Sequence, residues 1–330
     1  MIPEDKKDAV TRALRHAFGV EVFDDLRPLT VGLSSALVFR IVVKGHPYLL
    51  RVITRDDAIS DPTRQFACMK SAAEAGLAPS VLYTSIEDRV SITDFVEARP
   101  FSRAEALLRI PATLRTLHAL PPFPRVLNYL DFLEGYIERF RAAKILPESE
   151  TAELFELYAK VAEVYPRHDG EAVSCHNDLK PENILFAGDR VWLVDWEAAF
   201  LNDRYFDLAV VANFIVTQDA EEEDYLRRYF GEPAGAYRRA RFYLMRQVVH
   251  MSYSMVFTFL GSAGQAIEPH APVPDFREFH DAIWAGAVSL ATNEKRLEYG
   301  RVHMKQVLQN MQTEGFREAL RIVSEAGASA

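Results

Sequence analysis

The apolar pattern of the chain changes at about residue 97, and this change limits the folds that it can adopt. Before that point, short runs rich in Val, Ile, Leu, Phe and Tyr predict strands, with helices over 5–19 and 62–75; the predicted strands are 37–43, 48–53, 81–83 and 90–95. After it, longer segments predict helices over 102–119, 128–144, 149–164, 219–230, 234–260, 275–296 and 301–325. Only 184–186 and 191–194 look strand-like there. We therefore expect an α+β fold, with a small strand-rich lobe over residues 1–97 and a large helical lobe over residues 98–330.

Charge and apolar content exclude several classes of protein. The 330 residues include 38 Lys plus Arg and 47 Asp plus Glu, which gives a net charge of −9. This balance argues against a nucleic-acid partner and favours an amine-bearing small molecule. The most apolar long stretch, 243–260, is interrupted by Arg246, Gln247 and His250, so we expect no membrane span. With no apolar signal region at the start and two cysteines far apart in the chain, we expect a cytoplasmic protein.

The strongest functional signal is the segment 176–183, His-Asn-Asp-Leu-Lys-Pro-Glu-Asn, with Asp195 twelve residues beyond its end. Transfer of a phosphoryl group from ATP requires a divalent cation against the phosphates and an acceptor hydroxyl held in line. Mg²⁺ prefers carboxylate and amide oxygens, and a loop followed by a hairpin can bring such groups to one point. We therefore expect Asp178 to orient the acceptor hydroxyl and take its proton, and Asn183 and Asp195 to ligate Mg²⁺.

These motifs resemble the catalytic core of the protein-kinase-like fold and, within it, the aminoglycoside phosphotransferase and choline kinase family. The resemblance rests on segments 176–183, 195–197 (Asp-Trp-Glu) and 205–209 (Tyr-Phe-Asp-Leu-Ala), and it covers about residues 26–215. It implies a two-lobe, ATP-dependent enzyme that phosphorylates a hydroxyl of a small molecule. Aminoglycosides, choline, ethanolamine and related amino-alcohols or sugars are the implied acceptors.

The resemblance also implies a nucleotide site in the strand-rich lobe and the hinge after it. Its predicted residues are Gly32, Ser34 and Ser35 of a phosphate-covering loop, the cation Arg51, Gln65, and the backbone of Asp94 and Val96. Gln65 stands where the family usually has Glu, so it can hydrogen-bond Arg51 but cannot form an ion pair with it. Lys180 is implied to help neutralise the transferring phosphate, with a solvated surface lysine as the alternative.

Two other functions stay open at this level. The Gln at position 65 motivates a nucleotide-binding regulatory pseudokinase, although such a protein does not need the whole Asp178, Asn183 and Asp195 set. The segment 178–183 also resembles the catalytic loop of a protein serine/threonine kinase. Trp-Glu after Asp195, in place of Phe-Gly, and the short separation to Asp207 speak against that class.

Overall fold

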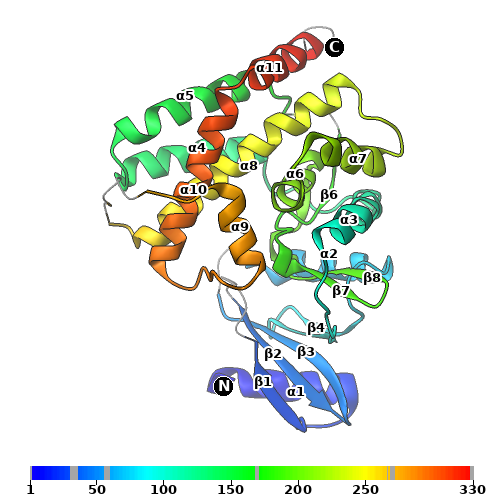
Figure 1. The fold of residues 1–330 in the computed structure, drawn as a ribbon. Coiled ribbons are helices and arrows are strands. Elements are labelled where there is room, and N and C mark those ends of the chain that lie inside the picture. The colour runs from blue at the N-terminus through cyan, green and yellow to red at the C-terminus, as the bar shows by residue number, and fades with distance from the viewer. Residues whose placement is uncertain are drawn as a thin grey trace. The chain divides into compact units, whose positions relative to one another are not determined.

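The structure is a computed structural model that describes residues 2–29, 36–55, 60–167, 171–265, 267 and 272–327. The chain divides into two compact units, which consist of residues 1–125 with 173–207, and of residues 126–172 with 208–330 (Figure 1). The strands are β1 (Asp25–Pro28), β2 (Ala36–Val43), β3 (His46–Ile53), β4 (Val81–Ser85), β5 (Val90–Asp94), β6 (Ala172–Cys175), β7 (Ile184–Ala187), β8 (Arg190–Leu193) and β9 (Phe200–Asp203).

The helices include three short 3-10 turns. The α-helices are α1 (Lys7–Phe18), α2 (Pro62–Glu74), α3 (Arg103–His118), α4 (Tyr129–Ala143), α5 (Glu148–Val164), α6 (Arg204–Ile215), α7 (Asp219–Phe230), α8 (Ala236–Ser262), α9 (Phe276–Trp284), α10 (Asn293–Met311) and α11 (Glu314–Gly327). The 3-10 turns are η1 (Glu4–Lys6), η2 (Pro181–Asn183) and η3 (Trp196–Ala198). Among the described residues, no helix combines the length and apolarity that a membrane span requires.

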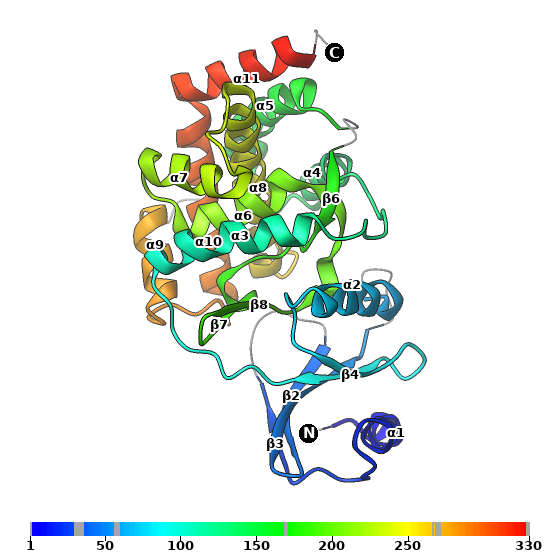
Figure 2. The same cartoon turned by 90° about the vertical axis from the view of Figure 1, so that its right-hand side faces the viewer.

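The first unit contains a five-stranded antiparallel sheet in the order β1-β2-β3-β5-β4. The hairpin between β2 and β3 turns at Lys44 and Gly45, both left-handed with φ of 51° and 77°, as a two-residue turn between twisted strands requires. Helix α1 lies against this sheet (Figure 2), and its face from Ala9 to Leu14 is buried with the inward side chains of the strands. This packing fixes β3 and β5, the two strands that carry predicted nucleotide-binding residues.

The second unit is built around α8, which is buried on most of its surface. Helix α10 makes the most extensive contact with α8 and approaches it very closely at Gly300. A Cβ at that position would lie 2.5 Å from Thr258 Oγ1 and 2.8 Å from the Thr258 backbone nitrogen. The two helix backbones can therefore pack at this distance only because residue 300 has no side chain.

The predicted fold class is confirmed, but several predicted elements are wrong in detail. The helix predicted over 275–296 ends at Trp284, and α10 begins after the N-cap Thr292; a second break at 312–313 divides the helix predicted over 301–325. Helix α3 begins at Arg103 and continues through Pro111 to His118, so the proline neither delays its start nor ends it. The analysis of the sequence missed α6, which is buried on nearly all sides and so has no amphipathic period, and the short strands β1, β6 and β9.

Candidate active site

A tight hairpin places the two predicted metal ligands, Asn183 and Asp195, side by side. Strands β7 and β8 are joined by Gly188 and Asp189, and their register sets Ile184 opposite Leu193. Asn183 directly precedes β7 and Asp195 follows β8 after one residue, so both lie at the open end of the hairpin. The Val194 N–H donates to the Asn183 carbonyl at 3.0 Å, and this hydrogen bond holds the two chain segments together where the strands end.

Asp178 forms hydrogen bonds with the other predicted members of its loop. Its Oδ2 accepts from Asn183 Nδ2 at 2.9 Å and from Lys180 Nζ at 2.7 Å. Burial raises the pKa of the Asp178 carboxyl, and the Lys180 ammonium opposes this shift. Burial lowers the pKa of Lys180, but the charge and hydrogen bond of Asp178, together with the charges of Asp195 and Glu182, outweigh it, so the net shift of the pKa is upward. An anchored carboxylate with a raised pKa suits a group that accepts a proton.

A buried carboxylate, that of Asp207, holds the backbone of this loop by hydrogen bonds. Asp207, at the start of α6, accepts the backbone N–H of His176 at 2.8 Å and that of Asn177 at 2.7 Å. Asn177 is left-handed, with φ of 63°, and these bonds help to hold it there. His176 in turn lies with Nε2 2.9 Å from the Val194 carbonyl. The loop that carries Asp178 is thereby tied to the segment that carries Asp195.

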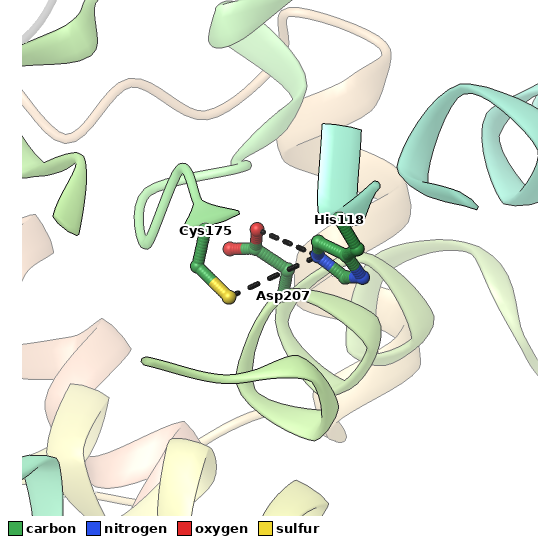
Figure 3. A group of neighbouring side chains, drawn as sticks. All are labelled: His118, Cys175 and Asp207. Atoms are coloured by element: carbon green, nitrogen blue, oxygen red, sulfur yellow. Dashed lines mark hydrogen bonds and ion pairs between the residues drawn. The ribbon is translucent and has the colours of Figure 1, made fainter. Parts of the chain in front are cut away.

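Asp207 is also part of a buried group with His118 and Cys175 (Figure 3). The His118 Nε2 atom lies 3.3 Å from Asp207 Oδ2, and the Cys175 thiol lies 3.6 Å from two backbone carbonyls to which it donates. Side chains of these types can bind a metal, but here the Cys175 thiol is directed to backbone carbonyls, and burial raises its pKa. Both carboxylate oxygens are already used by backbone donors. The group therefore fits a hydrogen-bonded brace rather than a metal site.

Arg51 reaches the same place from the sheet. From β3, its Nη1 lies 2.7 Å from Asp195 Oδ1 and its Nη2 lies 2.7 Å from Glu197 Oε2. The guanidinium thus bridges two carboxylates that are two residues apart in the chain. Burial, then the Asp195 charge, raises the pKa of Glu197, and Arg51 opposes this shift. One cation therefore balances two partly buried acids.

The donor set around Asp195 fits Mg²⁺. Asp195 Oδ1 is buried and accepts no hydrogen bond from the described residues. Its contact with Arg51 is an ion pair without hydrogen-bond geometry. The amide nitrogen of Asn183 is directed to Asp178, so its oxygen is the atom available to a cation. A carboxylate and an amide oxygen are hard donors of the kind that Mg²⁺ prefers.

A cavity of about 450 Å³ connects these groups with the hinge. Its lining includes the charged and polar side chains of Arg51, Asn183 and Asp195, together with the hinge residues 93–98. Its remaining wall is largely apolar, formed by Val38, Leu49, Phe66, Met69, Pro79, Leu185 and Trp196 among others. A pocket of this volume, with charged side chains and a largely apolar wall, has the size and chemistry to hold a nucleotide.

The structure brings together most of the residues that the sequence singles out. Asp178, Lys180, Asn183, Asp195 and Arg51 form one cluster, and Gln65, Asp94 and Val96 line the cavity. Gly32, Ser34 and Ser35 lie outside the described residues.

No hydrogen bond from the Arg51 guanidinium to the amide oxygen of Gln65 is found among the described residues. The buried Gln65 Nε2 has no hydrogen-bond partner there. The analysis of the sequence did not assign Glu197 as the partner of Arg51, which lies 146 positions away in the chain.

This fold and this site define a phosphotransferase of the kinase-like type. The chain belongs to the phosphotransferase enzyme family, which it matches over residues 25–243. It is 34% identical to protein LicA of Haemophilus influenzae over 88 residues, which are 26% of this chain and 33% of LicA. The match thus spans about a third of the length of that relative.

Solved structures show the same fold at low sequence identity. A choline/ethanolamine kinase family protein from Mesorhizobium loti superposes with a TM-score of 0.69 at 22% identity, covering 97% of this chain and 99% of that one. A ternary complex of streptomycin, ATP and APH(2″)-IIa superposes with a TM-score of 0.60 at 15% identity, covering 80% of this chain and 92% of that one. These similarities do not favour the pseudokinase or the protein kinase.

Proposed function

We propose that the protein transfers the γ-phosphoryl group of ATP to a hydroxyl of a small molecule. The observation that carries this proposal is the convergence of Asp178, Asn183 and Asp195: Asn183 and Asp195 line a cavity together with the hinge residues, and Asp178 is hydrogen-bonded to Asn183. A site that only bound nucleotide would not need an anchored carboxylate with a raised pKa beside the metal-ligand set.

Each side chain has a role in this proposal. Asp178 positions the acceptor hydroxyl and receives its proton, and Asn183 and Asp195 hold Mg²⁺. Arg51 and Lys180 neutralise phosphate charge, while the backbone of Asp94 and Val96 holds the adenine edge. When bound, Mg²⁺ supplies positive charge against the phosphates that the transfer requires.

The acceptor class is inferred from the relatives and from the charge of the chain. LicA of Streptococcus pneumoniae is a choline kinase, and APH(2″)-IIa has been solved with streptomycin. Both ligands carry hydroxyls and positive charge, and the net charge of −9 favours such molecules. We therefore place the acceptor among choline, ethanolamine, related amino-alcohols, aminoglycosides and amino sugars.

The test is ATP-dependent phosphorylation in a screen of these compounds, with homoserine, methylthioribose and neutral sugars included. The wild-type protein should phosphorylate at least one compound in the presence of Mg²⁺. Asp178→Asn should lower turnover by about 10³-fold or more while ATP still binds. Near-wild-type turnover by Asp178→Asn, or no transfer to any compound or to water, would contradict the proposal.

A further inference from the structure

Arg51, the cation of the proposed nucleotide site, is held by a carboxylate of η3 and not by one of helix α2. In kinase-like folds a helix carboxylate is expected to pair with the strand cation, and position 65 on α2 is where it is expected here. That position is a glutamine, 4% exposed, whose Nε2 has no hydrogen-bond partner among the described residues. Arg51 is nonetheless fixed by a carboxylate, since Glu197 Oε2 lies 2.7 Å from its Nη2.

We infer that Glu197 has taken over the task of the missing helix carboxylate and positions Arg51 for the phosphates of the nucleotide. This inference rests on the proposed function, because it concerns the same site. It assigns Glu197 as a positioning residue, which acts through Arg51.

The fold explains how Glu197 reaches this place. It lies on η3, which begins directly after Asp195, and η3 packs against α2, the helix that carries Gln65. Arg64 of α2 donates to the Ala199 carbonyl at 2.8 Å, which fixes the end of η3 against the helix. A residue of η3 can therefore present its carboxylate on the side where a residue of α2 would otherwise do so.

The two carboxylates that contact Arg51, those of Asp195 and Glu197, are expected to differ in how firmly they hold it when Mg²⁺ and nucleotide bind. Asp195 is a predicted metal ligand, so its charge is shared with a cation when Mg²⁺ is present. Glu197 forms a hydrogen bond to Nη2, whereas the Asp195 contact is an ion pair without an aligned hydrogen bond. Glu197 is thus the partner expected to keep the long Arg51 side chain ordered, which limits the entropy lost when phosphate binds.

The test is equilibrium binding of ATP to the full chain, measured by calorimetry with EDTA and again with Mg²⁺. Glu197→Gln should weaken ATP binding about tenfold or more in both conditions, as expected for loss of a charge-assisted hydrogen bond. Adding Gln65→Glu should recover most of that loss, because the carboxylate then comes from α2.

Each contrary result has a distinct meaning. Weaker binding of Glu197→Gln only with Mg²⁺ would overturn the inference and make Glu197 a metal ligand alone. Unchanged binding in both conditions, or no recovery by Gln65→Glu, would overturn it as well, because Glu197 would then not replace a carboxylate of α2. If the wild-type protein binds no ATP, the proposed function itself fails. If Glu197→Gln does not fold, Glu197→Asp replaces it: the carboxylate keeps its charge but lies farther from Arg51, because the side chain is one methylene shorter. Glu197→Asp should lose less ATP affinity than Glu197→Gln, and Gln65→Glu should recover that affinity as well. Glu21→Gln, which removes an exposed ion pair with Arg15, is the matched control and should bind ATP as the wild type does.

Discussion

Asp207 accepts the backbone N–H of His176 at 2.8 Å, although the two residues are 31 positions apart in the chain. With the second bond from Asn177, this contact makes one buried carboxylate responsible for the conformation of the loop that carries Asp178. The shape of the candidate active site therefore depends on a side chain that lies behind it.

Replacing Asp207 by Asn should damage both stability and turnover. An amide has one acceptor oxygen, so one of the two buried backbone N–H groups would face a donor, at a cost of about 1–3 kcal/mol in the free energy of unfolding. Urea unfolding measures the first effect, and turnover of the folded variant measures the second. Asp219→Asn, an exposed carboxylate in the first turn of α7, should change neither. Wild-type turnover of Asp207→Asn would show that the brace is dispensable.

Replacing Lys180 by Gln should move the pH dependence of turnover. Asp178 must be ionised to accept a proton, and the Lys180 ammonium at 2.7 Å opposes the rise of its pKa. Without that cation the pKa of Asp178 rises further, so the acid side of the profile shifts to higher pH. Turnover against pH for the wild type, Lys180→Gln and Lys180→Arg checks this, since the arginine keeps the charge. An unchanged acid side in Lys180→Gln would separate Lys180 from Asp178.

The sequence predicted the grouping of the site residues more accurately than the ends of the helices in the second half of the chain. Asp178, Asn183 and Asp195 are brought together by a loop and a two-residue hairpin, whose geometry follows from local residue types. The pairing of Arg51 with Glu197 joins residues 146 positions apart, and no local pattern encodes it. Helix ends near 284 and 312 depend on turn residues within otherwise helical sequence, and α6 shows no amphipathic period because almost every side chain in it is buried.

Gly300→Ala should destabilise the second unit. Its new Cβ would meet the Thr258 side chain and backbone at 2.5 and 2.8 Å, and the backbone can only yield if α8 and α10 separate. We expect a loss of about 1–3 kcal/mol in the free energy of unfolding. Gly135→Ala in α4 is the matched control, because its Cβ would meet nothing within 4 Å and alanine favours a helix by about 0.5–1 kcal/mol. Equal stability of the two variants would contradict the close approach of these helices.

Three buried histidines should make the stability of the second unit depend on pH. His250 Nδ1 lies 3.0 Å from His303 Nδ1, and His280 Nε2 lies 3.2 Å from the Tyr299 hydroxyl. Burial lowers the pKa of His280 to about 3, and it lowers those of His250 and His303 well below 6.5. The nearby cations Arg246 and Arg277 also lower these pKa values: both act on His250, and Arg277 acts on His280.

The imidazoles are therefore neutral in the folded protein and protonate in the unfolded chain below about pH 6.5. The unfolded state then binds more protons, so the free energy of unfolding falls as pH falls, by about 1.4 kcal/mol per pH unit for each histidine kept neutral. Urea unfolding from pH 7.5 to 5.5 measures this slope. His280→Gln cannot titrate and should have a shallower slope than the wild type, even if it is less stable at pH 7.5. His16→Gln, on the exposed face of α1, should keep the wild-type slope; equal slopes for all three proteins would show that the buried histidines are not the source.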